Sequence, residues 1–292
     1  MQYYSDMHPD PTSSAVTCPT CHGQTWSRLY HRQGWTFVRC ATCALVRLDP
    51  IPTDGQLAVH YGARFESGNY EPAKAAERLP TLRGVFAEFA SQEPGRIFDV
   101  GCFDGGLLDI ASEAKWETWG LDFQGPAVDI ARTKHPGHIA VGSLETYEPP
   151  RRDFDVVTGV GVIEHLRQPE AFARFAANSL RPGGLLVVQT PDRGSWPARL
   201  LGRYWPPIAP PEHIWYFNRA NLIRLLTEAG FEGFRVRSHW KRLRIGYAYE
   251  QLGVFGPELQ RLVRPVQKMP RLLDRHLPMY GGEMLLLAVR SH

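Results

Sequence analysis

Two pairs of cysteines near the N-terminus constrain the fold of this chain most strongly. Cys18 and Cys21 stand in "CPTC", Cys40 and Cys43 stand in "CATC", and 18 residues separate the two pairs. This spacing is typical of zinc sites in which two tight turns aim four thiolates at one ion. Because four thiolates complete a tetrahedral shell, the predicted zinc is structural rather than catalytic.

The residues between the two cysteine pairs predict a β-hairpin. Aromatic and aliphatic residues flank a turn at Gln33 and Gly34: Trp26, Leu29 and Tyr30 before it, and Trp35, Phe37 and Val38 after it. We therefore predict a zinc ribbon over residues 17–50, preceded by a flexible tail at residues 1–16. His22 and His31 lie nearby, but the four cysteines already complete the shell, so both are interpreted as surface residues. A module this small buries little apolar area, so the metal supplies much of its folding energy.

Composition places the chain among globular proteins. Its 292 residues are 43% hydrophobic, enough for one large domain or for a medium domain with a small companion. The net charge of +3, from 33 basic and 30 acidic residues, argues against a nucleic-acid partner. The N-terminus shows no signal-peptide pattern, and no stretch approaches 18 continuous apolar residues, so a cytoplasmic protein is expected.

A strand, a glycine-rich turn and a helix follow one another in "EPGRIFDVGCFDGGLLDIA". The strand is predicted at Ile97–Val100, and the helical pattern starts near Leu107. The turn departs from the dinucleotide pattern GxGxxG, because Phe103 stands where the second glycine belongs. A pyrophosphate ligand is therefore disfavoured.

Asp122 ends the next predicted strand, 23 residues after Asp99. An acidic side chain at this place can accept hydrogen bonds from both hydroxyls of an adenosine ribose. Ribose recognition without pyrophosphate recognition indicates S-adenosylmethionine. Further strands at Phe154–Thr158 and Leu185–Thr190, with a helix between them and a turn at Arg181–Gly184, form another β-α-β unit.

From this point the chain resembles the class I S-adenosylmethionine-dependent methyltransferases. The resemblance covers roughly residues 94 to 290 and depends on four motifs in order: "DVGCFDGG", "GLDFQ", "VGVIEHL" and "LRPGGLLVVQTPD". It implies an α/β fold with a doubly wound, Rossmann-like sheet of seven strands, the last strand antiparallel. The segments "FEGFRVRSH" and "MLLLAVRSH" look like the two final strands. We expect a helical linker or cap at residues 51–93 and the methyltransferase domain at residues 94–292, with a lid insertion at residues 191–217.

The resemblance also implies which residues bind the cofactor. Asp99, Gly101, Cys102 and Gly105 would line its methionine and ribose side, with Phe103 in the same loop. Asp122 would bind the ribose hydroxyls, Phe123 would flank the adenine, and Ser143 and Leu144 would meet the adenine edge. Gly159, Gly161 and Glu164 would face the methyl-transfer centre. Taken singly, Asp99 is also explained as a loop cap, Cys102 as a small buried side chain, and Glu164 with His165 as a helix start.

An acceptor hydroxyl or carbon acid would need help to lose its proton. Outside the ribbon the sequence shows no obvious second metal cluster, so a histidine or carboxylate base is the simpler proposal. His165 follows the fourth strand of the domain, and His213 lies beside Glu212 in the lid. Tyr70, in the linker, is a further candidate for the pocket. The open alternatives are a loop pair at Glu212 and His213 that only stabilises the lid, and ordinary packing for Tyr70.

The acceptor is expected to be a small metabolite. The zinc ribbon, the "GCFDGG" loop and the lid "EH" resemble bacterial deoxysugar C-methyltransferases, although Pro210 stands where that family has a tyrosine. A sugar-like or lipid-linked acceptor is therefore expected, methylated on O or C. The tryptophans and arginines of the lid would allow peripheral membrane contact, while a solvated lid is the simpler interpretation. RNA methylation and a degenerate, purely binding domain are the alternatives, and the oligomeric state is left open.

Overall fold

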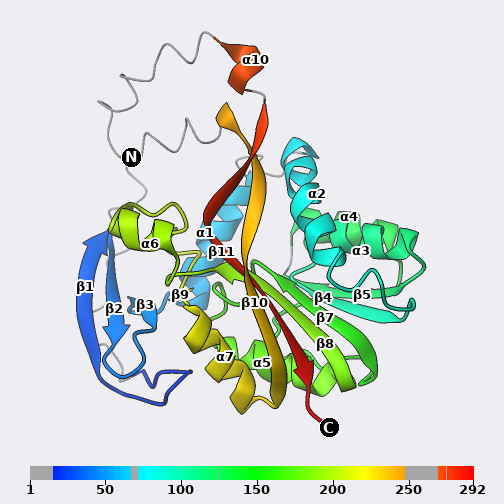
Figure 1. The fold of residues 1–292 in the computed structure, drawn as a ribbon, viewed down its shortest axis with the longest axis horizontal. Coiled ribbons are helices and arrows are strands. Elements are labelled where there is room, and N and C mark those ends of the chain that lie inside the picture. The colour runs from blue at the N-terminus through cyan, green and yellow to red at the C-terminus, as the bar shows by residue number, and fades with distance from the viewer. Residues whose placement is uncertain (1–15, 67–71, 124, 247–268, 274) are drawn as a thin grey trace.

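A twisted mixed sheet forms the centre of the molecule (Figure 1). The computed structural model describes residues 16–66, 72–123, 125–246, 269–273 and 275–292. Within these residues the sheet has seven strands, in the spatial order β10 (Phe231–Arg244), β11 (His276–Arg290), β8 (Leu180–Pro191), β7 (Phe154–Val160), β4 (Arg96–Val100), β5 (Glu117–Asp122) and β6 (Ile139–Val141). Strands β8, β7, β4, β5 and β6 are parallel, and β11 is antiparallel to both its neighbours. The predicted α/β class, with an antiparallel last strand, is confirmed.

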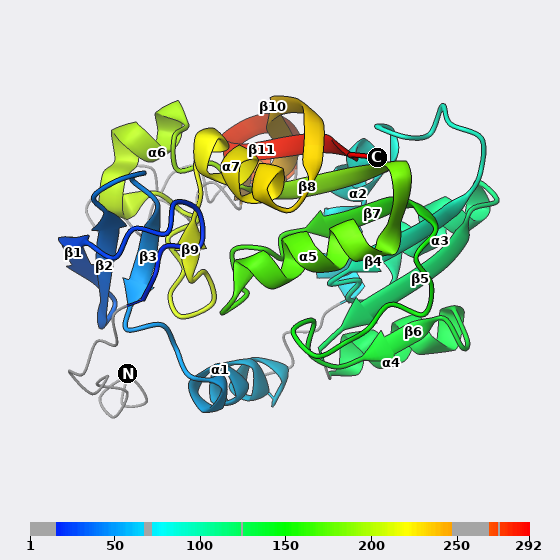
Figure 2. The same cartoon turned by 90° about the horizontal axis from the view of Figure 1, so that it is seen from below.

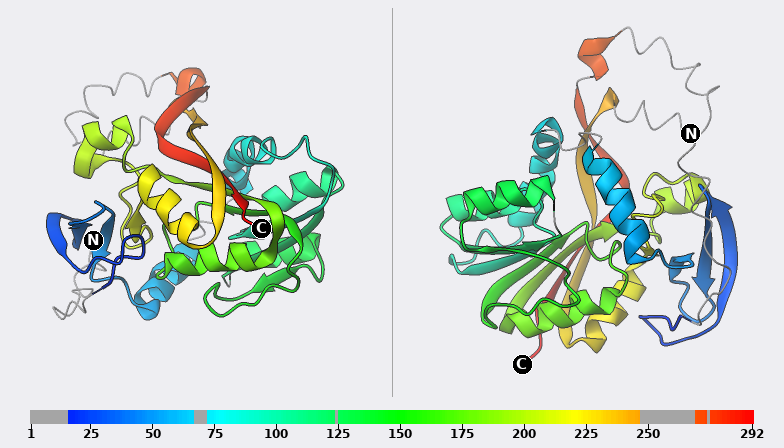
Figure 3. Two further views of the ribbon diagram at one scale, coloured as in Figure 1. Left: turned by 60° about the horizontal axis from the view of Figure 1, so that its bottom comes forward. Right: turned by 180° about the vertical axis from the view of Figure 1, so that it is seen from behind.

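Helices cover both faces of this sheet (Figures 1 and 3). Helices α2 (Pro72–Phe86), α3 (Gly106–Glu113) and α4 (Pro126–Lys134) lie on one face, and α5 (Pro169–Ser179) and α7 (Arg219–Glu228) lie on the other. Because side chains alternate along a strand, neighbouring residues enter different cores. Ile97 packs in the cluster that contains Leu107 of α3, whereas Phe98 packs in the cluster that contains Phe172 of α5. Strands buried on both faces explain the continuous apolar runs in the sequence.

The order of the strands creates a crevice at their carboxyl ends. From β4 the chain winds outward through β5 to β6, and it then returns to pair β7 with the other side of β4. In doubly wound sheets a ligand binds at such a reversal, outside the carboxyl ends of the strands. The loops after β4, β5 and β7 are therefore the part of the fold that builds the site.

Strand β8 is longer than predicted. It begins at Leu180 and includes the residues Arg181–Gly184, for which a turn was expected. The pairing of Leu180 with Phe154 extends the strand, and the Arg181 guanidinium contacts the Asp155 carboxylate at 2.7 Å. Strands β10 and β11 also run beyond the expected segments, since their pairing extends to Arg244 and His276.

The cysteine-rich region forms a second sheet at one end of the molecule (Figure 2). Strands β1 (Trp26–Arg32) and β2 (Trp35–Cys40) form the predicted hairpin, and its turn is made by Gln33 and Gly34, both with positive φ. Strand β3 (Val46–Asp49) pairs with β2. The fourth strand, β9 (Trp215–Tyr216), comes from the lid and pairs with β3. Two segments about 170 residues apart in sequence therefore share one sheet.

The lid contains short helices that pack on the ribbon. Helix α6 (Trp196–Leu201) is followed by the 3-10 helix η1 (Gly202–Tyr204). A buried apolar cluster joins lid and ribbon, and its members are Trp35, Phe37, Val46, Leu48, Ala198, Trp205, Ile208 and Tyr216. Helix α1 (Asp54–Glu66) follows the ribbon, and the short helix α10 (Pro270–Leu273) precedes β11. Among the described helices, none combines the length and the apolar character needed to cross a membrane.

Candidate functional site

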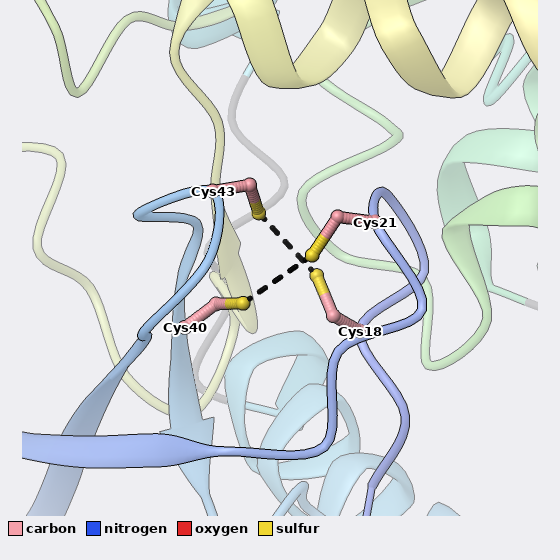
Figure 4. Close-up of side chains that lie close together, drawn as sticks. All are labelled: Cys18, Cys21, Cys40 and Cys43. Atoms are coloured by element: carbon pink, nitrogen blue, oxygen red, sulfur yellow. Dashed lines mark hydrogen bonds between the residues drawn. The ribbon is translucent and has the colours of Figure 1, made fainter.

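The four cysteines of the ribbon converge on one point (Figure 4). The Sγ atoms of Cys18 and Cys43 are 3.5 Å apart, as are those of Cys21 and Cys40, and all four sulfurs lie within 4.8 Å of one another. A tetrahedral zinc ion bound at about 2.3 Å would need sulfurs about 3.8 Å apart. The donor set therefore fits a zinc ion of the predicted structural kind.

Burial and hydrogen bonds shift the pKa values of the cluster thiols in different directions. Burial raises the pKa of the Cys18 thiol to about 11 and that of Cys43 further. At Cys40 burial is outweighed by the backbone N–H groups of Cys43 and Thr42, and its pKa falls to about 7. Four thiolates so close together require a positive charge between them.

The two nearby histidines do not belong to this cluster. His22 contacts the Glu228 carboxylate at 2.9 Å, and His31 contacts the Thr36 hydroxyl at 3.3 Å. Both lie at the surface, as interpreted from the sequence. The contact of His22 with Glu228 also joins the ribbon to the last residue of α7.

Backbone and side-chain hydrogen bonds attach the ribbon to the catalytic domain. The Asn221 side chain donates to the Cys43 carbonyl at 2.9 Å, and the Leu48 N–H donates to the Ile214 carbonyl at 2.9 Å. Asn221 itself belongs to the capping box of α7, because its N–H donates to the Asn218 side chain. One residue thus joins the start of α7 to the second cysteine pair.

The loop after β4 has the strained conformation that cofactor loops need. Gly101 has a φ of +71°, and any side chain there would collide with Val162. Phe103, which stands at the second glycine position of the pattern, adopts a φ of +53°, in the left-handed region that favours glycine. Its ring lies 4.6 Å from the guanidinium carbon of Arg78, a cation–π contact from α2. Gly105, with a φ of +79°, is the residue before α3.

Two carboxylates stand at the ends of neighbouring strands, one buried (Asp99) and one partly exposed (Asp122). Asp99 accepts a hydrogen bond from Thr158 Oγ1 at 2.6 Å, and burial raises its pKa to about 7. Asp122 accepts from the backbone N–H groups of Phe103 and Phe123, each at 2.6 Å, and burial likewise raises its pKa. Asp122 therefore ties the loop after β4 to the end of β5, where a ribose would bind. The positive charges of S-adenosylmethionine would favour the ionised form of both groups.

The other predicted cofactor residues differ in exposure. The Phe123 side chain is 59% exposed beside Asp122, so its ring is open to a stacked base. Cys102 is 3% exposed and lies against Gly120, and burial raises the pKa of its thiol, so its side chain is a small packing group. Ser143 donates from its hydroxyl to the Glu145 carboxylate, and the Leu144 side chain packs in the core.

Gly159 lies near the end of β7, and Gly161 and the buried Glu164 follow the strand. A Cβ at Gly159 would meet the Phe172 ring, and Gly161 has a φ of +67°. Glu164 is 2% exposed, and burial raises its pKa to about 7 although Thr190 Oγ1 donates to its Oε2 at 2.9 Å. The Glu164 carbonyl accepts from the Ile214 and Trp215 N–H groups at 2.8 and 3.1 Å. The lid is thereby attached to the loop after β7.

The predicted catalytic histidines meet beside this glutamate. The rings of His165 and His213 are perpendicular, with centroids 4.7 Å apart, and His165 Nε2 lies 4.0 Å from Glu164 Oε1. His213 Nδ1 donates to the Pro207 carbonyl at 2.8 Å, which leaves the lone pair on Nε2. Glu164, His165 and His213 place one possible metal-binding atom each within 4.8 Å of one another. The sequence shows no obvious second metal cluster because His213 is brought to Glu164 and His165 only when the lid packs on the loop after β7.

Helix α1 contributes Tyr61, which the resemblance to zinc-ribbon relatives places with Tyr70 over the cofactor or acceptor, and His60, which sequence reasoning did not assign to the site. His60 Nε2 lies 3.2 Å from Glu212 Oε1, and the Tyr61 hydroxyl lies 3.5 Å from His165 Nδ1. The feature of the sequence that could have indicated His60 is its position next to Tyr61 in the N-terminal part of the linker. The predicted candidate Tyr70 lies outside the described residues. Glu212 and His213 are neighbours in sequence but contact different partners, His60 and Pro207.

Comparisons with known proteins agree with this architecture. A family model described as "Methyltransferase domain" matches residues 71–236. A "probable S-adenosylmethionine-dependent methyltransferase" of Mycolicibacterium smegmatis is 33% identical over 51% of this chain and 56% of its own length. A ubiquinone biosynthesis O-methyltransferase of Idiomarina loihiensis is 27% identical over 48% of this chain and 63% of its own length. The chain thus spans roughly half to two thirds of these curated relatives.

A solved structure shares the fold. An S-adenosylmethionine-dependent methyltransferase of Thermotoga maritima superimposes with a TM-score of 0.52 at 21% identity, covering 80% of this chain and 99% of that chain. The family model matches more than half of the present chain. With the strand order, the glycine-rich loop and the paired carboxylates, these comparisons show that the chain belongs to the methyltransferase domain family, whose relatives here are S-adenosylmethionine-dependent methyltransferases.

Proposed function

We propose that this protein transfers a methyl group from S-adenosylmethionine to an oxygen or carbon atom of a small acceptor. The observation that carries the proposal is the pair of carboxylates, buried Asp99 and partly exposed Asp122, at the carboxyl ends of β4 and β5 beside a loop with the required glycines. Asp122 has the position to bind the ribose hydroxyls, and Asp99 the position to attract the cationic methionine moiety. S-Adenosylmethionine, when bound, supplies the methyl group on a sulfonium leaving group.

The protein's contribution to the reaction is to position the acceptor and to assist its deprotonation. His165 and His213 lie side by side where the loop after β7 meets the lid, and Nε2 of His213 carries a lone pair. Glu212 is oriented by His60 at 3.2 Å. We propose that the lid pair Glu212 and His213 assists loss of the acceptor proton. In-line alignment of acceptor and methyl group then lowers the barrier further.

The acceptor is proposed to be sugar-like, a natural product or lipid-linked. The ubiquinone biosynthesis O-methyltransferase among the relatives supports an oxygen acceptor, and the lid supports a lipid-linked one. Trp196, Leu200 and Trp240 are between 59% and 74% exposed, and the ring of Tyr280 lies near both tryptophans. Exposed tryptophans of this kind are typical of membrane interfaces. Flotation with phospholipid vesicles tests the proposed membrane contact. The wild type is expected to float with the vesicles, and replacement of Trp196 and Leu200 is expected to abolish this binding.

Calorimetry with S-adenosylmethionine tests the enzymatic proposal first. Asp122→Ala is expected to abolish measurable binding, whereas Asp129→Ala, at an exposed site on α4, leaves it unchanged. Transfer of a radiolabelled methyl group to nucleotide sugars, hydroxylated quinones and lipid-linked sugars then identifies the acceptor class. A wild-type chain that keeps its zinc but binds no S-adenosylmethionine would refute the proposal and favour a purely binding role.

A zinc ion in the ribbon is proposed on the geometry of the four sulfurs. Metal analysis of the purified chain is expected to show one zinc that is lost when Cys21 and Cys43 are replaced with serine. A chain that folds with full ribbon structure in the absence of metal would contradict this assignment.

A further inference from the structure

Glu164, His165 and His213 form a group of metal-binding side chains separate from the ribbon cysteines. Within the described residues, their ligand atoms lie within 4.8 Å of one another. They come from two segments that are distant in sequence, the loop after β7 and the lid, and the Glu164 carbonyl holds these segments together through the Ile214 and Trp215 N–H groups. The geometry thus depends on main-chain hydrogen bonds rather than on flexible side chains alone.

Hydrogen bonds orient each side chain as a ligand. His213 Nδ1 donates to the Pro207 carbonyl, so the lone pair is on Nε2. Thr190 donates to Oε2 of Glu164, so Oε1 is the oxygen that faces His165 Nε2, 4.0 Å away. His165 Nδ1 lies 3.5 Å from the Tyr61 hydroxyl. Partners of this kind, on the far side of the ring or carboxylate, are typical of metal-binding histidines and carboxylates.

The charge of the group also favours a cation. Glu164 is 2% exposed, and Lys241, which attracts it, is already paired with Glu283 at 2.5 Å. An ionised carboxylate buried this deeply, with the His165 imidazole 4.0 Å away, is costly, and a divalent ion between the three ligands would offset that cost. Ligands about 2.1 Å from an ion lie about 3 Å apart, so the side chains would close by about 1 to 2 Å on binding.

We propose that Glu164, His165 and His213 bind a divalent cation, which holds an acceptor that carries two adjacent oxygen atoms. The inference rests on the proposed methyl-transfer function and specifies how His213 assists deprotonation. Two imidazoles and one carboxylate leave up to three positions open on a six-coordinate ion, enough for a bidentate acceptor such as a vicinal diol, a catechol or a 2-hydroxy ketone.

The cation would make the acceptor hydroxyl more acidic. The hydroxyl gives its proton to water, the new oxygen–methyl bond forms as the sulfur–methyl bond breaks, and the electron pair of that bond stays on sulfur. S-Adenosylhomocysteine, the methylated acceptor and one proton are the products. No oxidant or reductant is required.

Titration with Mn²⁺ of the full chain, with zinc retained in the ribbon, tests the site. Mn²⁺ prefers nitrogen and oxygen ligands and does not compete for four thiolates, so the signal of free Mn²⁺ in electron paramagnetic resonance reports the second site. We expect one Mn²⁺ per chain and binding weakened at least tenfold, roughly, by His165→Gln or His213→Gln. His22→Gln, on the ribbon surface, is the matched control and should bind Mn²⁺ as the wild type does.

A second measurement, the unfolding temperature with and without Mn²⁺, distinguishes loss of the metal site from misfolding of a variant. Mn²⁺ should raise the unfolding temperature of the wild type and of His22→Gln but not that of His165→Gln or His213→Gln. Absence of saturable binding in the wild type, or wild-type binding in both site variants, would overturn the metal site. Equal methylation of catechol and phenol with and without Mn²⁺ would overturn the proposed acceptor class.

Failure of the methyl-transfer function has a different signature. If that function is wrong, S-adenosylmethionine does not bind in calorimetry, whatever the Mn²⁺ titration shows. If only the metal site is wrong, S-adenosylmethionine binds normally and the Mn²⁺ signal stays that of the free ion.

Discussion

Replacing Asp99 with asparagine tests the electrostatics of the cofactor loop. The carboxyl is 4% exposed, and burial raises its pKa from the ordinary 3.8 to about 7, although Thr158 and Arg78 favour the charged form. At a pH between these two pKa values, the Asp99 carboxyl is protonated in the folded chain and ionised in the unfolded chain. The free energy of unfolding therefore falls as the pH rises from about 4 to about 7, and it is lowest above that range.

The magnitude follows from the two pKa values. At about 1.4 kcal/mol for each tenfold change in a protonation equilibrium, the loss is on the order of 4 kcal/mol once Asp99 is fully ionised. About 2 kcal/mol of this loss falls between roughly pH 5.5 and 8.5. Asparagine keeps the oxygen that accepts from Thr158 Oγ1 at 2.6 Å and carries no charge. We expect Asp99→Asn to gain about 2 kcal/mol more stability, relative to wild type, at pH 8.5 than at pH 5.5.

Denaturant unfolding of the ligand-free, zinc-bound chain at both pH values is the assay. Asp129→Asn is the control, because its side chain is 73% exposed and its stability difference should be the same at both pH values. An Asp99→Asn difference that does not depend on pH would refute the argument that burial keeps this carboxyl uncharged. The same variant should bind S-adenosylmethionine more weakly, since the charge that destabilises the empty site attracts the ligand.

Three further perturbations test other parts of the structure. Phe103→Gly should be about 1 kcal/mol more stable than Phe103→Ala in thermal unfolding, because alanine is strained at the positive φ of this position and glycine is not. Both variants lose the contact with Arg78, so that contact does not contribute to the difference, and equal stabilities would contradict backbone strain at Phe103. Removal of zinc by a strong chelator should raise the rate of amide hydrogen exchange at Trp215 and Tyr216 about tenfold or more, while the amides of β4 stay protected. An unchanged exchange rate in β9 would show that the lid is ordered without the ribbon. His213→Gln should lower turnover at saturating substrate about 100-fold or more with S-adenosylmethionine affinity unchanged in calorimetry, and full turnover would remove His213 from the reaction.

The central sheet was predictable because its signals are local. Parallel strands are buried on both faces, so β4 is visible as an apolar run before Gly101. The loop after it needs glycine, and the acidic residue that ends β5 follows at a short distance in sequence. The ribbon hairpin was predictable for the same reason, from a two-residue turn and alternating apolar residues. Sequence motifs also indicated Asp99 and Asp122, which the structure places beside the loop after β4.

The proposed acceptor site was only half predictable, because its contacts join distant segments. The sequence indicated His165 and His213, but the approach of His213 to Glu164 and His165 depends on the packing of the lid on the loop after β7. His60 meets Glu212 across 152 residues, and nothing in the pattern of α1 indicates this partner. Strand β9 has two residues, too few for a period-two pattern, and it is a strand only because β3 lies beside it.

The pairing of β9 with β3 restricts how an acceptor can enter and leave. A lid on an open loop moves independently, but here the residues just after His213 belong to the ribbon sheet, and Trp205 fixes the other end of the segment in the same apolar cluster. Opening would therefore require the ribbon to swing with the lid or the β3–β9 hydrogen bonds to break. For the proposed acceptor site, either route would make exchange of acceptor and product slow compared with a free loop. Loss of the proposed zinc ion from the ribbon would then change the rate of product release without touching a residue of that site.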